Sequence, residues 1–494
     1  MSALIKSSCD IQWPLHRTRM LIGGELVESE SRRRFDVVNP ADECVIGSAP
    51  HGSASDIDDA VQAAQQAQPA WAALGVAGRT AHLHDISRRL AVRAQELLEV
   101  EVMDTGNTIA RMKADVAKSI EVFEYFAGLG YELKGHSVPS SPGNLHFSMR
   151  EPYGVVGGIA PFNHPILFAA MRMAAPLMAG NTVVIKPSEQ SPLSTSILAE
   201  ICAEALPAGV ANIVSGFGAE AGDALVRHPM VKRIAFTGSV PTGLMIQRSA
   251  AEVSVKHVSV ELGGKNPMIV FPDFDVQRAV AMAINGMNFA WAGQSCGSTS
   301  RIFVHDTLYD RFVALLQERV AAIRLGSPMD ERSEMGPVNS SQHYRKVLDY
   351  VDIAHTDGAR LLHGGKRPEG TVFERGYWIE PTVFVDVTHT MRIAQEEVFG
   401  PIMSVLRWSS MDDMIQMVNG TGLGLTASIL TKDLNTAFTT ARRVQSGYVW
   451  INGCSAHFRG TGFGGFKNSG VGREEGLEEL LSYTEEKTYH VFLE

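Results

Sequence analysis

The sequence predicts an α/β protein with two doubly wound α/β domains and a small β arm. Two observations predict the domains: strand-like and helical runs alternate from residue 154 to 264, and a second alternating block extends from about 265 to 462. The arm is predicted because the strand-like segments at 136–154 and 482–494 have no core of their own. Alternation of this length is typical of parallel sheets with helices on both faces.

The first third of the chain is expected to be mostly helical. Residues 55–71 begin with a Ser/Asp cap and keep apolar residues at helical spacing, and residues 80–106 end on a glycine stop signal. Another helix is predicted from about Ile109 to Gly128. Turn residues followed by alternation at 136–154 then predict a hairpin that interrupts the first domain.

The first alternating block is expected to contain five strands joined by helices. The strands are predicted at 154–160, 181–186, 212–216, 233–238 and 256–264, and the helices at 165–180, 191–205, 219–228 and 239–252. Ser191 is expected to cap the second helix, with Pro192 in its first turn.

The second block predicts another α/β domain. Strands are expected within 266–271, 301–305, 398–408 and 447–452, together with a helix that runs through Trp291 and a helix at 307–323. These elements divide the chain into a first domain of 1–129 and 153–264, a second domain of 265–462, and a bridging segment of 130–152 and 463–494.

The composition is that of a globular protein with a large core. Of the 494 residues, 45% are hydrophobic and 20% are charged, and the formal net charge is −10. This acidic balance argues against a nucleic-acid partner, and the densest basic run, "SRRRF" at 31–35, is interpreted as a solvated loop.

The sequence also argues against membranes and oxidised compartments. The N-terminus lacks the apolar segment of a secretory signal, and Asn163, His164 and Arg172 interrupt the most apolar region, 154–180. Five cysteines, odd in number and far apart, predict neither a metal site nor a disulfide framework. These features favour a cytoplasmic protein.

Polar or glycine-rich stretches follow all five strands of the first block directly. They are "APFN", "KPSE", "SGFG", "FTGS" and "ELGG". Ligands of open α/β sheets bind beyond the carboxyl ends of the strands, so these stretches predict a nucleotide-sized site. "FTGSVPTG" has Gly238 and Gly243 five positions apart and is not the usual dinucleotide fingerprint; it could also be a plain strand-to-helix turn.

These stretches, together with "ELGGKNP", "GQSC" at 293–296 and "EEVFGP" at 396–401, resemble the aldehyde dehydrogenase superfamily from "GGELVES" to "YTEEKT". The resemblance implies a Rossmann-like cofactor domain and a catalytic domain. It also implies NAD(P)-dependent oxidation of a small aldehyde to the carboxylic acid, by the hydrolytic type of enzyme, without a metal. The bridging segment, including 134–152 and 482–494, would then pair subunits in a homodimer or homotetramer.

Cys296 is the nucleophile that the resemblance implies, and it would form a thiohemiacetal and then a thioester. Its small neighbours leave room for a substrate, although a lone cysteine is more commonly a buried structural residue. Asn163 and the backbone N–H of Cys296 would stabilise the oxyanion, while a helix cap is the alternative role for Asn163. Glu261, otherwise a solvent-exposed strand end, would activate water, which favours a free acid as product.

The resemblance also implies a set of cofactor contacts. Lys186 and Glu189 would bind the adenine ribose, and the carboxylate favours NAD, with NADP possible. Glu397 and Phe399 would hold the nicotinamide half, unless "EEVFGP" is only a surface turn. The other implied contacts are Ile159, Ala160, Pro161, Phe162, Asn163, Ser188, Gly218, Gly222, Phe236, Gly238, Ser239 and Leu262.

The substrate is expected to reach Cys296 through a mainly apolar tunnel, lined by Phe168, Met171, Ser295, Gly297 and Phe463. The chain departs from the family pattern near this tunnel, with Phe162, His164, Arg172 and Gly462 at positions where relatives mostly carry other residues. His164 could be an acid/base group, although a histidine in the tunnel wall or at the helix start is the simpler interpretation.

Two other functions are compatible with parts of the sequence. A cofactor-independent thiol hydrolase or esterase would use Cys296 and His164 and would leave the five strand-end loops without a ligand. A binding protein that kept the fold would not need Cys296, Glu261 and Asn163.

Overall fold

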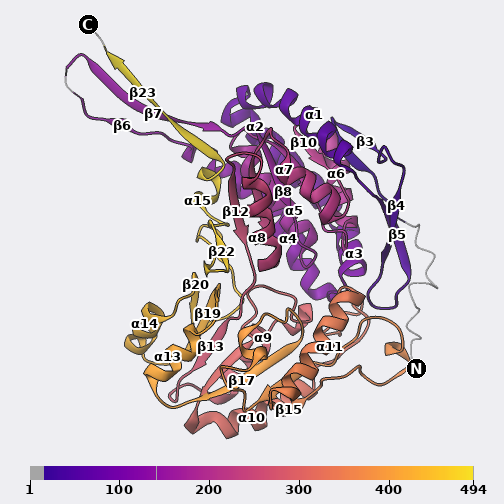
Figure 1. The fold of residues 1–494 in the computed structure, drawn as a ribbon, viewed down its shortest axis with the longest axis vertical. Coiled ribbons are helices and arrows are strands. Elements are labelled where there is room, and N and C mark those ends of the chain that lie inside the picture. Colours follow the sequence, from indigo (N-terminus) through magenta and orange to yellow (C-terminus); the bar gives the residue numbers. More distant parts are fainter. Residues whose placement is uncertain (1–15, 141, 493–494) are drawn as a thin grey trace.

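The computed structural model describes residues 16–140 and 142–492, in which two large sheets with their helices form two α/β layers and a long ribbon projects from one of them (Figure 1). The expected N-terminus without a signal lies outside the described residues. No helix within 16–140 and 142–492 has the length and apolar character needed to cross a membrane.

The first sheet confirms the predicted parallel arrangement. Its order is β22-β12-β11-β8-β9-β10-β2-β3, and its five central strands run parallel. The central strands are β8 (Val155–Ile159), β9 (Thr182–Lys186), β10 (Ala211–Ile213), β11 (Val231–Thr237) and β12 (His257–Glu261). The antiparallel edges are β2 (Met20–Ile22), β3 (Glu25–Val27) and β22 (Gly470–Val471).

Helices join these strands where the sequence predicts them. They are α5 (Pro165–Met178), α6 (Leu193–Ala205), α7 (Asp223–Arg227) and α8 (Val240–Ala251), and α7 is preceded by a π-helical turn, η2 (Gly218–Gly222). Because every crossover leads to a parallel strand, the carboxyl ends of β8 to β12 meet at one edge of the sheet. The five polar stretches therefore share that edge.

The N-terminal helices differ from the prediction in their boundaries. They are α1 (Ala54–Ala73), α2 (Gly75–Val92), α3 (Ala94–Thr105) and α4 (Ile109–Leu129). Ser53 caps α1 in a capping box with Asp56. The single helix expected at 80–106 is wrong: Arg93 leaves the helical conformation, with φ −97° and ψ 13°, and its guanidinium binds Glu96 and Glu200.

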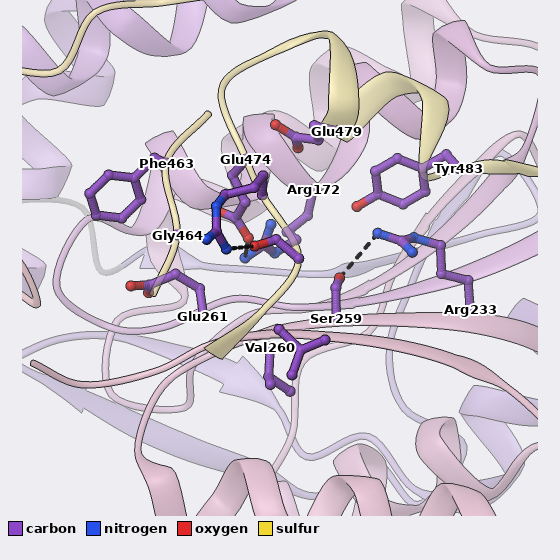
Figure 2. Close-up of a pocket in the computed structure, with 13 residues that line it drawn as sticks. Arg172, Arg233, Ser259, Val260, Glu261, Phe463, Gly464, Glu474, Glu479 and Tyr483 are labelled. Atoms are coloured by element: carbon purple, nitrogen blue, oxygen red, sulfur yellow. Dashed lines mark hydrogen bonds and ion pairs between the residues drawn. The ribbon is translucent and has the colours of Figure 1, made fainter. Parts of the chain in front are cut away.

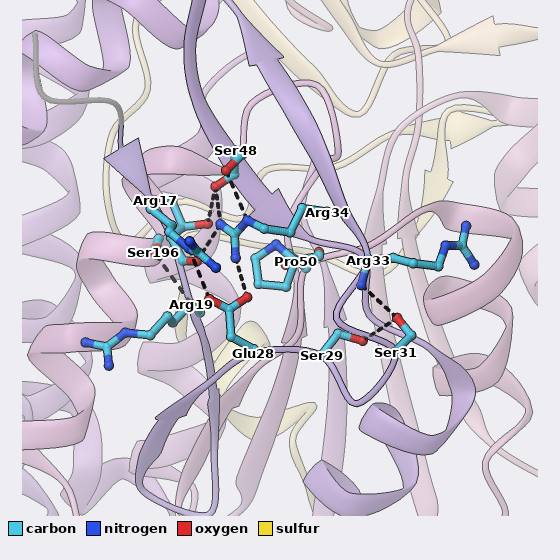
Figure 3. Close-up of polar contacts among 12 residues, drawn as sticks. Arg17, Arg19, Glu28, Ser29, Ser31, Arg33, Arg34, Ser48, Pro50 and Ser196 are labelled. Atoms are coloured by element: carbon cyan, nitrogen blue, oxygen red, sulfur yellow. Dashed lines mark hydrogen bonds and ion pairs between the residues drawn. The ribbon is translucent and has the colours of Figure 1, made fainter.

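The prediction that the first third is mostly helical missed a small sheet before α1. Its strands are β1 (His16–Arg17), β4 (Arg34–Val38) and β5 (Val45–Pro50). Arg34 is only half-buried but bonds Ser48 and binds Glu28, so the basic run is partly built into this sheet instead of being a solvated loop (Figure 3). Cys44 is disulfide-bonded. Sequence spacing gave no sign of a cross-link at Cys44 because it does not report which segments pack together; Cys202, Cys296 and Cys454 are free.

The second sheet also confirms an α/β layer. Its order is β15-β16-β17-β14-β13-β19-β20, parallel except for the β15–β16 pair. The strands are β13 (Pro267–Val270), β14 (Arg301–His305), β15 (Arg360–His363), β16 (Thr382–Val385), β17 (Ile402–Trp408), β19 (Thr426–Leu430) and β20 (Tyr448–Ile451). The helices around it are α9 (Val276–Gly286), α10 (Asp306–Ala321), α11 (Ser341–Thr356), α12 (Arg392–Gln395), α13 (Met411–Asn419) and α14 (Leu434–Arg443).

The helix expected to run through Trp291 ends earlier. α9 stops at Gly286, and Trp291 lies in a single 3-10 turn, η3 (Phe289–Trp291). Asn288 and Ala292, on either side of that turn, have left-handed backbones with φ of 58° and 50°, which cannot continue an α-helix. This break turns the chain into the loop that carries Cys296.

A long antiparallel ribbon projects from the first layer (Figure 1). It consists of β6 (Ser137–Val138), β7 (Asn144–Pro152) and β23 (Thr484–Phe492), and β7 and β23 pair along nine residues. The predicted hairpin is present, and the tail completes it as a three-stranded sheet. Leu145, Met149 and Phe492 are exposed on this ribbon, and its role between subunits stays a prediction.

Candidate active site

The edge formed by the carboxyl ends of β8 to β12 has the features of a nucleotide cleft. Ser239 accepts the N–H of Thr242 and so caps α8, whose first turn is partly exposed. Gly243 packs directly on Leu262, because a Cβ there would lie 2.7 Å from a Leu262 methyl. A helix N-terminus of this kind suits a phosphate group.

Lys186 and Glu189 lie together at the end of β9. The Lys186 Nζ is 2.8 Å from a Glu189 carboxylate oxygen, and Lys186 is buried whereas Glu189 is partly exposed. Gly222 stands beside the Lys186 stem, since a Cβ there would be 3.9 Å from the Lys186 Cδ. A Cβ at Gly218 would meet no described atom within 4 Å, so packing in the described chain does not require glycine there.

Other implied contacts belong partly to the core. Ile159, Ala160, Phe236 and Leu262 are at least nine-tenths buried, so their backbones, more than their side chains, are available to a ligand. Gly238 lies close to the Phe236 ring, where a Cβ would approach to 2.4 Å. Pro161, Phe162 and Ser188 keep partial exposure at the same edge.

The "ELGGKNP" stretch shapes the loop around the thiol. A Cβ at Gly263 would lie 1.9 Å from a carboxylate oxygen of Glu397, and the Gly264 N–H donates to that carboxylate at 3.0 Å. A Cβ at Gly264 would approach the Cys296 carbonyl to 2.7 Å. Both glycines are needed because Glu397 and the thiol loop press against this backbone.

Asn266 fixes the thiol loop, and the sequence analysis did not single it out. Its buried amide nitrogen donates to the carbonyls of Cys296 at 2.6 Å and Ser298 at 2.9 Å, and its amide oxygen accepts the Thr426 N–H. The sequence offered one sign of this role, because Asn266 is a polar residue placed directly before a buried strand.

Asn163 is brought to the same loop. Its amide nitrogen donates to the carbonyl of Gln294 at 3.0 Å, and its own carbonyl accepts from Asn107. An amide nitrogen has two N–H groups, so one remains for an oxyanion. Within the described chain, the backbone N–H of Cys296 has no acceptor, which makes it available as a second donor.

The alternative role of Asn163 as a helix cap is wrong. His164 occupies the N-cap position of α5 without a side-chain cap, and Glu101 on α3 accepts the Ile166 N–H instead. The expected cap at Ser191 is also wrong. The Ser191 hydroxyl donates to the Phe162 carbonyl, while Asp104 accepts the Leu193 N–H at the start of α6.

Cys296 and Glu261 influence each other's pKa, although within the described residues neither oxygen of the buried Glu261 carboxyl has a hydrogen-bond partner. The Cys296 side chain is partly exposed, and it lines a pocket. Burial raises the pKa of the Cys296 thiol, and the nearby carboxylate of Glu261 raises it further. Burial likewise raises the pKa of Glu261 well above the usual carboxyl range, while interaction with the Cys296 thiol opposes that shift.

A buried charged cluster lies behind Glu261 (Figure 2). Arg172 binds Glu474 at 2.6 Å and also bonds the Thr237 hydroxyl. The charge of Glu474 raises the pKa of Glu261, and that of Arg172 lowers it. Glu479 and Tyr483 complete this cluster, so the protonation of Glu261 depends on residues from the C-terminal segment.

Glu397 and Phe399 stand opposite the first sheet. Burial raises the pKa of Glu397 and lowers that of the neighbouring Lys265 to about 7. The Phe162 and Phe399 rings meet edge to face at 5.8 Å, and His343 donates from Nε2 to the Phe399 carbonyl at 2.6 Å. Phe162 from the first domain and Phe399 from the second, both implied to contact the cofactor, thus pack against each other.

A pocket with a volume of about 360 Å³ opens onto the thiol. It brings together Cys296 with all five implied tunnel residues, Phe168, Met171, Ser295, Gly297 and Phe463. The expectation of a mainly apolar tunnel is incomplete, because histidines, lysine, arginine and carboxylates also line the wall.

Comparison with known proteins identifies the family. The chain matches the model of the aldehyde dehydrogenase family over residues 26–489. The chain belongs to the aldehyde dehydrogenase family. It is an enzyme of the class that oxidises aldehydes.

Individual relatives agree with this family assignment. The aldehyde dehydrogenase tropH of Talaromyces stipitatus is 43% identical over 97% of this chain and 94% of the relative. A putative aldehyde dehydrogenase from Burkholderia cenocepacia is 40% identical, with a TM-score of 0.94 over 97% of this chain and 98% of its own. Betaine aldehyde dehydrogenase from Staphylococcus aureus, solved in complex with NAD+, is 37% identical with a TM-score of 0.94 over 97% and 95%.

Several residues of this aldehyde dehydrogenase escaped the sequence analysis. Glu101 and Asp104 on α3 are fully buried, and burial raises the pKa of each to about 8. They hold the starts of α5 and α6, next to Asn163 and Ser191. Nothing in the local sequence marks them, because they act on helices far along the chain. Within the described residues, no cluster suited to a metal ion is found.

Proposed function

We propose that this enzyme oxidises an aldehyde to the free carboxylic acid with NAD+ as hydride acceptor, through a thiohemiacetal and a thioester on Cys296. The observation that carries the proposal is the Cys296 thiol at the wall of the tunnel pocket, with the Asn163 amide held by the same loop and the buried Glu261 carboxyl near enough to shift the pKa of the thiol. A nucleophile, a proton acceptor and an oxyanion donor then surround one point.

In the first step, the Cys296 sulfur bonds to the aldehyde carbon and its proton passes to Glu261. The carbonyl oxygen becomes an alkoxide that accepts from the Asn163 amide and the Cys296 backbone N–H. A bound NAD+ would supply the acceptor for the hydride of the same carbon, whose loss would leave a thioester on Cys296. Loss of one such oxyanion donor raises the barrier by about 3 kcal/mol.

In the second step, Glu261, deprotonated again, takes a proton from water while the water oxygen bonds to the thioester carbon. The carbon–sulfur bond breaks, the carboxylic acid leaves and Cys296 is restored. Water and NAD+ are consumed, and acid, NADH and a proton are formed. Burial raises the pKa of Glu261 well above the usual carboxyl range, and a carboxylate with a raised pKa is a stronger base toward water.

The residues at the sheet edge fit a dinucleotide. Ser239 and the start of α8 would receive the pyrophosphate, Lys186 and Glu189 the adenine ribose, and Glu397 with Phe399 the nicotinamide half. The Glu189 carboxylate supports NAD+ over NADP+, because it would repel a 2′-phosphate. The NAD+ complex of the Staphylococcus aureus relative supports NAD+ as a cofactor, and the preference over NADP+ rests on Glu189.

The thiol hydrolase that does not need a cofactor gains no support from the geometry. Its proposed base, His164, uses Nδ1 to bind Asp115, and no described hydrogen bond joins it to Cys296. We also propose that the exposed ribbon of β6, β7 and β23 pairs subunits in a homodimer or homotetramer, because its edges are uncovered in one chain.

The test measures reduced-nicotinamide absorbance with a panel of aldehydes, with NAD+ and NADP+ compared. Wild-type enzyme is expected to oxidise aldehydes with NAD+, and Cys296→Ser is expected to be inactive. Cleavage of p-nitrophenyl acetate is measured in parallel without cofactor. Ester hydrolysis with no aldehyde oxidation, or full activity of Cys296→Ser, would overturn the proposal.

A further inference from the structure

Two histidines in the wall of the thiol pocket are held by carboxylates in the same way. His164 Nδ1 lies 2.6 Å from Asp115 on α4, and His457 Nδ1 lies 2.8 Å from Glu475. All four residues line the pocket that contains Cys296. The two pairs come from distant parts of the sequence, and the fold brings both histidine–carboxylate pairs to the wall of one pocket.

The carboxylates determine which ring nitrogen remains available. A carboxylate accepts from Nδ1–H, so Nε2 carries a lone pair in the neutral ring and an N–H in the protonated ring. No described atom hydrogen-bonds Nε2 of His164 or His457. The two side chains are 14% and 28% exposed, and neither Nε2 is a fully buried atom, so a ligand in the pocket can reach them. A hydroxyl can satisfy either protonation state, since it both donates and accepts.

Aromatic rings surround both histidines. The His164 ring lies 5.5 Å from that of Trp291 and 6.0 Å from that of Phe168. The His457 ring lies 4.6 Å from that of Phe463 and stacks on Tyr448 at 5.9 Å. Walls of this kind favour a flat, apolar body with a polar group at its edge.

The charge of the pocket argues against an anionic substrate. Four carboxylates line it, and two cations, Lys118 and Arg459, face them. Glu474 is neutralised by the buried Arg172, which leaves Asp115, Glu121 and Glu475 in excess of the cations. A carboxylate on the aldehyde substrate would therefore be repelled by the negative charge of this partly enclosed site.

We propose that His164 and His457 select uncharged, hydroxylated aromatic aldehydes by hydrogen-bonding the substrate hydroxyl through Nε2. This inference rests on the proposed aldehyde oxidation. The simpler role of the two pairs is structural, in which Asp115 only fastens α4 to α5 and Glu475 only fastens the loop after β20. A structural role predicts no change in preference between substrates when Nε2 is removed.

The experiment compares kcat/KM for 3- and 4-hydroxybenzaldehyde with kcat/KM for the corresponding methoxybenzaldehydes. Each methoxy compound keeps the ring oxygen but cannot donate a hydrogen bond. The hydroxy-to-methoxy ratio cancels variant effects common to both substrates. His164→Asn and His457→Asn keep an amide near Nδ1 to hold the carboxylate but lack Nε2. The Gln variants place a nitrogen near Nε2 and serve as rescue.

Wild-type enzyme is expected to prefer the hydroxy compounds, and the ratio is expected to fall about tenfold in at least one Asn variant, the effect of one lost hydrogen bond. The matching Gln variant is expected to recover part of it. His84→Asn, on the exposed side of α2, is the matched control with an unchanged ratio. 4-Carboxybenzaldehyde is expected to be a poor substrate.

An unchanged ratio in both Asn variants overturns the inference. If thermal melting shows that these variants do not fold, the wild-type enzyme alone tests the inference. A hydroxy-to-methoxy ratio of kcat/KM of one or less overturns it, and so does a preference for 4-carboxybenzaldehyde. Failure of the proposed function looks different, because then no aldehyde in the panel reduces NAD+.

Discussion

Asn266 offers the sharpest test of how the fold positions the thiol. Its amide makes three buried hydrogen bonds, two to the carbonyls of Cys296 and Ser298 and one from the Thr426 N–H. Asn266→Ala removes all three hydrogen bonds. The two carbonyls and the Thr426 N–H then have no hydrogen-bond partner in a buried site. At about 1 kcal/mol for each bond, the free energy of unfolding is expected to fall by about 3 kcal/mol.

The catalytic loss should exceed what this destabilisation explains. Once the two carbonyls are released, the thiol loop can shift, and a displacement on the order of 1 Å costs roughly 100-fold in rate. We expect kcat/KM for aldehyde oxidation to fall by that factor at a temperature where the variant is fully folded. Alkylation of Cys296 by iodoacetamide, followed by mass spectrometry, should change in rate as well.

Asn419→Ala is the matched control. Asn419 also bridges backbone groups through its amide, to the Arg443 carbonyl and from the Gln445 N–H, but it does not line the thiol pocket. It should lower the melting temperature with kcat/KM within twofold of wild type. An Asn266→Ala enzyme that is destabilised yet retains full kcat/KM would refute the positioning role.

Three further predictions concern the groups around Glu261. Glu261→Gln should lower kcat for aldehyde oxidation by on the order of 100-fold, because the Cys296 proton and the water proton both lose their acceptor; NADH absorbance measures it, and wild-type turnover would contradict it. The negative charge of Glu474 raises the pKa of Glu261, which must be deprotonated to act as a base. In Glu474→Gln the acidic limb of the kcat–pH profile should therefore move to lower pH. A shift to higher pH would contradict the stated effect of Glu474 on Glu261. Gly263→Ala should abolish activity through its clash with Glu397, whereas Gly128→Ala, where a Cβ meets no described atom within 4 Å, should leave activity unchanged; circular dichroism checks folding.

The sequence was most informative where local pattern and chemistry coincide. Strict alternation predicted the central strands of the first sheet, and the five strand-end stretches predicted which edge would be polar. It failed where a distant residue replaces a local one. Ser191 was expected to cap α6, yet Asp104 on α3 accepts the Leu193 N–H. The break at Arg93 carries no glycine or proline and depends partly on ion pairs, one of them with Glu200 on α6.

The sequence by itself predicted the alternation of strands and helices in the two large sheets and, through its motifs, the family and a candidate nucleophile. Those properties depend on hydrophobic period and residue type, which are local. Only the tertiary structure decided that Asn266 holds the Cys296 loop, that Glu474 adjusts the pKa of Glu261, and that His164 and His457 face one pocket with Nδ1 already engaged. Electrostatic and hydrogen-bond energies depend on distance and burial, and chain folding sets both between residues that are far apart in sequence.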